Sequence, residues 1–191
     1  MKKKTSFLLA LPFLIWACNN ESKDSVEKAD SANEAKLDSP ATHATITTDA
    51  ETTDFLVKAA NCGMAEVQFG QLAQEKAINQ QVKDLGKMMA DEHSAANEQV
   101  KSLAAQRNVS LPATLSDEKK KDYDNLAKKS GKDFDKAYLS LLESEHKTDI
   151  DLFEKSVDKI NDAEVKTFIN NTIPKLKSHH QSVKDLQKSI K

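Results

Sequence analysis

Arginine is almost missing from this sequence, because Arg107 is the only one and every other basic residue is a lysine. This scarcity argues against a site built on the bidentate recognition of anions, which guanidinium groups supply. Glycine and proline number four each and aromatic residues make up 5% of the chain, so most of the sequence is free of turn signals and suits long helices. The sequence has no glycine-rich phosphate-binding loop and no arrangement of serine, histidine and aspartate typical of a hydrolase.

The charge balance gives the chain no excess of basic residues. The formal net charge is -2, and without Lys2, Lys3 and Lys4 the 28 basic residues fall to 25 against 30 acidic residues. A face that binds nucleic acid or an anionic membrane surface is therefore not expected.

Residues 1–17 have the pattern of a secretion signal. A positive start at Lys2–Lys4 precedes the apolar run Phe7–Trp16, which is shorter than the roughly 20 apolar residues that cross a bilayer. The run ends in Ile15-Trp16-Ala17-Cys18, which resembles the bacterial lipobox, and this resemblance implies lipid attachment at Cys18. The alternative is an ordinary signal peptide with an incidental cysteine. The lipid would anchor the protein in the bacterial cell envelope, at the outer membrane and facing the periplasm or the surface.

Residues 18–52 are predicted to form the lipidated cysteine and a disordered tether. The stretch from Asn19 to Thr52 is rich in small and polar residues and has no sustained apolar period, so it cannot bury enough surface to fold. With Cys18 carrying lipid, Cys62 has no partner for an intramolecular disulfide and is expected to be a small buried residue.

Residues 53–191 are predicted to form the folded domain. Apolar residues recur at alternating steps of four and three in four long segments, which indicates four helices with one inward face each. Ser116 can cap a further short helix in the longer connection between the second and third long helices. The predicted fold is all-α, a four-helix bundle with one crossover connection that carries a short extra helix, which is the ferritin-like topology.

Four stretches carry a family resemblance over about Thr53 to Leu186: Met64-Ala65-Glu66-Val67, Met88 to Asn97, Asp133 to His146, and Pro174-x-Leu176-x-x-His179. Together they resemble a ferritin-like domain of unknown function found in secreted and outer-membrane bacterial proteins. The resemblance implies the bundle fold and no activity.

Each long helix has one polar residue on its apolar stripe, namely Glu66, His93, His146 and His179. The members of each hairpin lie at similar distances from their turn, so the four groups are predicted to meet at mid-bundle. Glu143 lies three residues before His146, a spacing that places a carboxylate and an imidazole on one helix face, as in di-iron bundles. The di-iron pattern is incomplete, because Ala90 occupies the position equivalent to Glu143 and the fourth helix offers a histidine instead of a glutamate.

Two interpretations of these residues remain open. One is a polar network in which Glu66 pairs with histidines and fixes the helix register, with no cofactor, in a non-enzymatic binding or structural, stress-related protein. The other is a metal-binding or redox protein with one zinc, iron or copper ion at Glu66, His93, Glu143, His146 and His179. The first is the favoured function, and the protein partner is not identified by the sequence.

Overall fold

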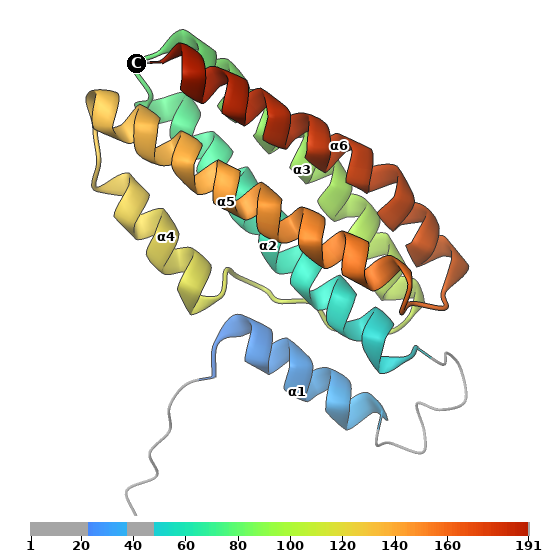
Figure 1. Cartoon of the computed structure of the whole chain (residues 1–191). Helices are drawn as coiled ribbons and strands as arrows, with labels where there is room; N and C mark the ends of the chain where they lie inside the picture. Colours follow the sequence, from blue (N-terminus) through green and yellow to red (C-terminus); the bar gives the residue numbers. More distant parts are fainter. Residues whose placement is uncertain (1–22, 38–47, 191) are drawn as a thin grey trace, which may run out of the picture.

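The computed structural model describes residues 23–37 and 48–190, and the described residues form helices without strands (Figure 1). The helices are α1 (Ser25–Leu37), α2 (Ala50–Lys76), α3 (Gln80–Gln106), α4 (Asp117–Ala127), α5 (Gly131–Val157) and α6 (Ala163–Ser189). The predicted all-α helical bundle is confirmed. The predicted signal peptide and the lipidation site at Cys18 lie outside the described residues.

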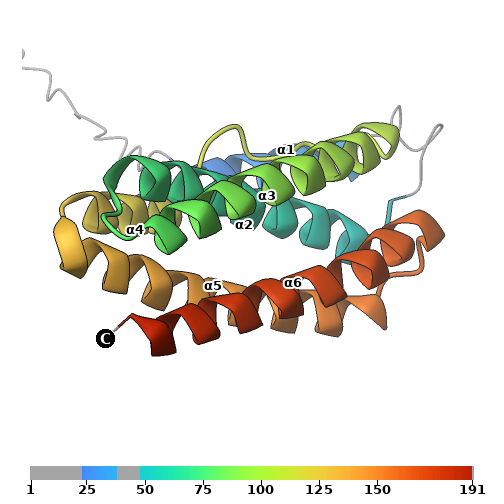
Figure 2. The same ribbon diagram turned by 90° about the horizontal axis from the view of Figure 1, so that it is seen from above.

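The four long helices form two antiparallel hairpins, α2 with α3 and α5 with α6 (Figures 1 and 2). The connection from α3 to α5 returns along the bundle and carries α4, which packs on α2 and α5. Helices α3 and α5 therefore run in the same direction. One long crossover between two hairpins places each of the four inward stripes against the same central axis.

Polar side chains cap several helices where the chain enters them. Asp49 accepts from Thr52 N at the start of α2, and Ser116 accepts from Lys119 N at the start of α4. Asp162 accepts from Glu164 N and Val165 N at the start of α6. These contacts satisfy backbone amides that have no partner inside a helix.

The apolar core is divided into two clusters, one toward each end of the bundle. The first is centred on Phe69, Met89, Phe134, Tyr138 and Leu142. The second is centred on Phe55, Phe153, Ile160, Phe168 and Ile169. The predicted polar residues lie in the layer between the two clusters.

Two glycines allow α2 and α3 to approach closely. A Cβ atom on Gly70 would lie 2.5 Å from Gly86 O, and one on Gly86 would lie 2.8 Å from Gly70 O. Both atoms are backbone oxygens that cannot rotate away, so any side chain here would push the hairpin apart. The close approach also brings the polar residues of α2 and α3 within reach of each other.

The prediction of a disordered tether over residues 18–52 is wrong where the structure describes this stretch. Helix α1 lies against the bundle, and Asn33 bonds reciprocally to Ser110, with Asn33 Nδ2 to Ser110 O at 2.9 Å and Ser110 N to Asn33 Oδ1 at 2.6 Å. Thr114 N also donates to Ser25 Oγ at 3.0 Å. The contacts are mostly polar, and Ala29 is the only buried apolar side chain over residues 25–36, so this part of α1 lacks the apolar stripe by which a docked helix is recognised.

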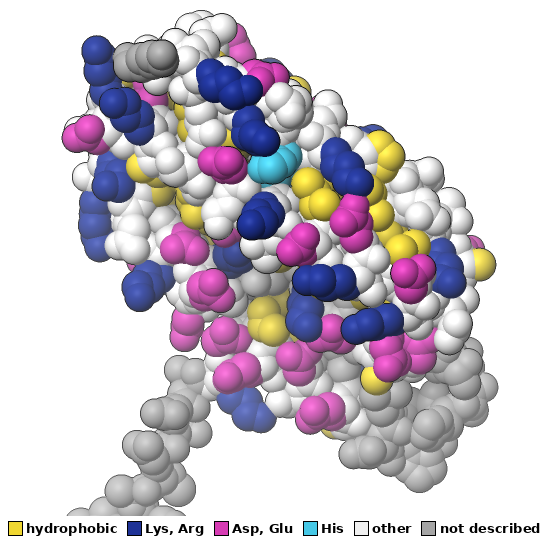
Figure 3. All heavy atoms as spheres, in the orientation of Figure 1, with side chains coloured by type: hydrophobic (Ala, Val, Ile, Leu, Met, Phe, Trp, Pro, Cys, Tyr) yellow, Lys and Arg dark blue, Asp and Glu magenta, His cyan; other side chains and the backbone are white. Residues whose placement is uncertain are grey.

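The surface of the described part is charged and mixed in sign. Figure 3 shows lysine and arginine side chains interspersed with aspartate and glutamate over the face seen in Figure 1. Among the described residues, no helix is both long and apolar enough to cross a membrane.

Candidate metal centre

The structure brings the four predicted mid-bundle residues together, one from each long helix. Glu66 of α2 and His146 of α5 are 0% exposed, His93 of α3 is 6% exposed and His179 of α6 is 5% exposed. Polar side chains buried to this degree need partners, because the loss of water is costly. Their contacts therefore decide what the layer can do.

The three histidines form a nearly equilateral triangle across the bundle axis. The ring centroids of His93 and His146 are 5.6 Å apart, and the centroid of His179 is 5.4 Å from each of the others. One ring nitrogen from each imidazole lies within 4.8 Å of the other two. This clustering brings three potential nitrogen ligands to one point.

The Glu66 carboxylate bridges two of the imidazoles. Its Oε2 lies 2.8 Å from His93 Nδ1 and its Oε1 lies 3.0 Å from His146 Nδ1. Neither contact has the angle of a well-aligned hydrogen bond, so the interaction is mainly electrostatic. Glu66 of α2 thus contacts two of the three imidazole rings at once.

Two further groups orient the rings from outside the triangle. His146 Nδ1 also lies 3.0 Å from Leu142 O, one turn earlier on α5. His179 Nε2 lies 3.0 Å from Glu92 Oε2 across the gap between α3 and α6. Such carbonyl and carboxylate partners fix the orientation of metal-binding histidines and raise their basicity.

The remaining nitrogen of each imidazole has no hydrogen-bond partner within the described part of the chain. These atoms are His93 Nε2, His146 Nε2 and His179 Nδ1, and all three are buried. A buried nitrogen without a partner is costly, and here three occur in one layer while their opposite nitrogens are engaged. The pattern leaves one free donor atom on every ring of the triangle.

Burial keeps the three rings neutral near physiological pH. It lowers the pKa of His93 to about 4, although Asp149 and Glu92 act in the opposite direction. Burial also lowers the pKa of His146 and, together with the charge of His93, that of His179. Neutral imidazole is the form that coordinates a metal ion, so the site does not have to lose protons first.

The carboxylate beside the triangle on α5 is Asp149, and the inclusion of Glu143 in the site was wrong. Glu143 is half-buried and accepts from Gln187 Nε2 at 3.0 Å, outside the histidine layer. Asp149 is 2% exposed, and its Oδ1 has no partner among the described residues. Asp149 follows His146 by three residues on the same apolar stripe, so its spacing could have suggested it as readily as that of Glu143.

Asp149 and Glu66 share the centre, and no lysine or arginine of the described ranges forms an ion pair with either of them. Burial and then the charge of Glu66 raise the pKa of Asp149 well above its usual range, and burial also raises the pKa of Glu66. Asp149 forms a side-chain hydrogen bond with the Cys62 thiol, whose pKa burial and the Asp149 charge also raise. Burial and the proximity of the two carboxylates therefore oppose the ionisation of both groups.

A second buried charged pair lies just outside the histidine layer and fixes α4. Lys119 of α4 donates to the Glu145 carboxylate of α5, and both side chains are less than 10% exposed. Because the Glu145 carboxylate is paired with the Lys119 ammonium, it is not available to contact the three histidines, although it is buried next to His146. The pair also attaches the crossover connection to the same part of α5 that carries His146.

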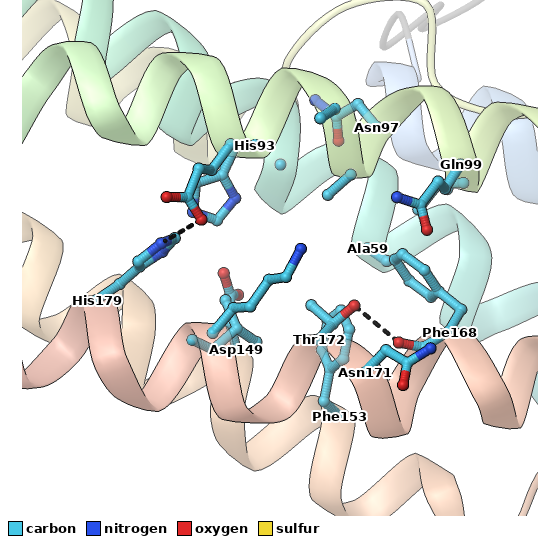
Figure 4. A pocket seen from close by; sticks show the side chains of 17 residues that line it. Ala59, His93, Asn97, Gln99, Asp149, Phe153, Phe168, Asn171, Thr172 and His179 are labelled. Atoms are coloured by element: carbon cyan, nitrogen blue, oxygen red, sulfur yellow. Dashed lines mark hydrogen bonds and ion pairs between the residues drawn. The ribbon is translucent and has the colours of Figure 1, made fainter.

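A pocket of about 200 Å³ leads from the surface to the histidine layer. It lies between α3 and α6, with side chains of α2 and α5 behind it, as Figure 4 shows. His93, His179 and Asp149 line one end, and Phe153 and Phe168 line the other. His146 and Glu66 do not line it, so two of the three imidazoles are reached directly from the pocket.

Comparison with known proteins places residues 36–186 within one family model, described as a domain of unknown function, DUF4142. No curated protein and no solved structure matches the chain. The matched range contains Glu66, the three histidines and Asp149. Because the match covers well over half of the sequence, the chain belongs to the DUF4142 family.

Proposed function

We propose that this protein binds a single transition-metal ion through His93, His146 and His179 at the centre of its helical bundle. The observation that carries the proposal is that each imidazole has one nitrogen in contact with a partner and one nitrogen without a partner. Each ring has one nitrogen held by Glu66, by Leu142 O or by Glu92, and one buried nitrogen without a partner. Outer partners on one side and free nitrogens on the other are the arrangement of histidine ligands in metal sites.

A polar network without metal explains only half of this arrangement. It accounts for the contacts of Glu66 with His93 and His146, which fix the position of α2 against α3 and α5. It does not account for the free nitrogens, since each buried unsatisfied group costs about 1–3 kcal/mol. A network selected for stability would have matched these atoms with donors or acceptors, whereas a metal ion uses all three.

The donor set favours zinc, copper or iron. Three neutral imidazoles suit these ions, and hard cations such as magnesium and calcium prefer oxygen ligands. Tetrahedral zinc with Zn–N distances of about 2.0–2.1 Å would bring the nitrogens to about 3.4 Å from one another, so small rotations of the rings complete the site. The Glu66 carboxylate supplies negative charge beside the cation, and the fourth position faces Asp149 and the pocket.

The proposal includes the location of the metal site on the cell envelope. The pattern of residues 1–17 and the lipobox-like sequence before Cys18 support export and a lipid anchor. The bundle would then present a metal centre outside the cytoplasm. Replacement of Cys18 by serine should abolish lipid labelling and release the protein from washed membranes, and retention on the membranes would contradict the anchor.

The neighbouring residues His179 and His180 provide a matched test of the metal site. The parent chain should bind zinc or copper with one ion per chain in calorimetric titration, and the ion should raise the melting temperature. His179→Gln should lose both effects. His180→Gln, which removes a histidine from the same helix but not from the triangle, should retain them.

Two results would contradict the proposal. The first is a parent chain that binds no metal with defined stoichiometry after removal of chelators. The second is equal metal binding by His179→Gln and His180→Gln, which would place the ion elsewhere. Either result would leave the polar network as the role of this layer.

A further inference from the structure

We propose that the pocket between α3 and α6 binds a small monocarboxylate, whose carboxylate completes the coordination of the metal and whose apolar body lies against Phe153 and Phe168. The inference rests on the proposed function and names the class of ligand that the metal centre takes. It follows from the polarity of the two ends of the pocket, from its size and from the charges around it.

The inner end of the pocket carries free polar atoms. His93 Nε2, His179 Nδ1 and Asp149 Oδ1 are buried without partners, and their residues line this end. Figure 4 shows His93, His179 and Asp149 at the same end of the pocket. A ligand head that reaches this end meets the open metal position.

The opposite part of the pocket is apolar. Phe153 and Phe168 face it together with Val100 and Leu176. These side chains belong to the second core cluster, so the wall is rigid and preformed. Its volume of about 200 Å³ exceeds the roughly 150 Å³ of an apolar cavity that holds benzene, so a six-carbon ring or a chain of similar size fits.

The charge near the inner end favours an anion. Lys175 lines the pocket one helical turn before His179, and its positive charge acts on that ring. No acidic side chain in the described ranges pairs with Lys175. Two acidic residues lie at the same end, and both are already engaged, Glu92 with His179 Nε2 and Asp149 with the Cys62 thiol. A carboxylate head would thus be attracted by the charges of both the metal ion and Lys175, whereas a neutral molecule would not.

The test uses benzoate as the probe and benzamide as its neutral control, with the full chain first saturated with zinc. Calorimetry should show one benzoate site on the zinc-loaded protein and at least tenfold weaker binding of benzamide. The metal-free protein should bind benzoate at least tenfold more weakly than the loaded protein, because the head then lacks its main partner.

Matched variants locate the site. Ala96→Leu adds a side chain to the pocket wall and should abolish benzoate binding with zinc binding intact, whereas Ala105→Leu, on an exposed position of the same helix outside the pocket, should not change it. Lys175→Gln should weaken benzoate about two- to fivefold. Lys177→Gln removes an exposed lysine outside the pocket and should leave benzoate affinity unchanged.

The outcomes separate the two proposals. If zinc does not bind, the proposed metal centre fails and the ligand inference fails with it. If zinc binds but benzoate does not, or binds equally to metal-free protein or to Ala96→Leu, the inference is overturned and the metal centre stands.

Discussion

The two ends of the bundle differ from its middle in the polarity of the side chains that they bury. The end clusters are built from large, mainly apolar residues that pack on one another, with Phe55 packed edge-on against Phe153 at 5.0 Å and Phe134 stacked on Tyr138 at 6.2 Å. The middle layer holds Glu66, three histidines and Asp149, and several of their atoms have no partner. The ends therefore supply stability, and the middle carries the cost of its unpartnered atoms, which the proposed metal ion would offset.

The largest expected effect is on stability, at the end of the bundle that holds the second apolar cluster. Phe55→Ala should lower the free energy of unfolding by about 3–5 kcal/mol, because it removes a fully buried ring from the second cluster. Urea unfolding measures this loss. The variant should still bind one zinc ion at low temperature, and a loss of zinc binding while the protein remains folded would show that the end and the middle are not independent.

A substitution in the middle layer should have a smaller effect on stability and a complete effect on metal. His93→Leu should destabilise the metal-free protein by about 1–3 kcal/mol, because Glu66 loses one of its two imidazole contacts. It should also abolish the rise in melting temperature that zinc gives the parent.

The double variant Glu66→Leu with His93→Leu sharpens this result. It should recover part of the stability lost in His93→Leu, since no carboxylate is then left short of a partner. If the double variant is less stable than His93→Leu, Glu66 is held by His146 well enough to stabilise the layer by itself.

A smaller effect with a defined pH dependence is expected at the second cluster's end, where Arg107 binds Asp162. Arg107 Nη2 lies 2.5 Å from Asp162 Oδ1 and Arg107 Nε lies 2.8 Å from Asp162 Oδ2, and the hydrogen bonds from Arg107 lower the pKa of Asp162. A carboxylate whose pKa is lowered by folding stabilises the protein at pH values above its unfolded-state pKa, which is near 4. This contribution is lost as the pH falls through the folded-state pKa.

Asp162→Asn keeps the helix cap and removes the charge. It should cost about 1–2 kcal/mol at pH 7, and the cost should shrink as the pH falls below about 4, as measured by urea midpoints. Asp151→Asn, in an exposed pair with Lys155, is the control and should change stability by less than about 1 kcal/mol at pH 7. A cost for Asp162→Asn that does not vary with pH would contradict the ion pair.

The smallest effect is expected from the N-terminal helix. A chain that begins at residue 48 loses α1 but keeps the Asp49 cap of α2, and its melting temperature should change little because α1 buries few apolar side chains. A chain that begins at residue 53 also loses the cap and the buried Thr52, and should lose about 1 kcal/mol more. Equal stability of the two chains would show that the cap contributes nothing.

The polar layer was predictable because it depends on periodicity within single helices. Glu66, His93, His146 and His179 each fall on an apolar stripe, and the short connections of the hairpins set the heights of both pairs. The docking of α1 was not predictable in this way. Its attachment depends on Asn33 and Ser25 meeting backbone groups of residues 110 and 114, and neither partner leaves a periodic signal in the sequence.

The sequence by itself determined that histidines from three helices and a glutamate from the fourth face the bundle axis, whereas only the tertiary structure decided which carboxylate of α5 joins them. Glu143 and Asp149 are each three residues from His146, and at 100° per residue they lie about 60° to either side of it. The pattern along one helix cannot distinguish these two sides. The placement of α5 between its neighbours does, because it turns Glu143 toward Gln187 of α6 and Asp149 toward Cys62 of α2, and so into the centre.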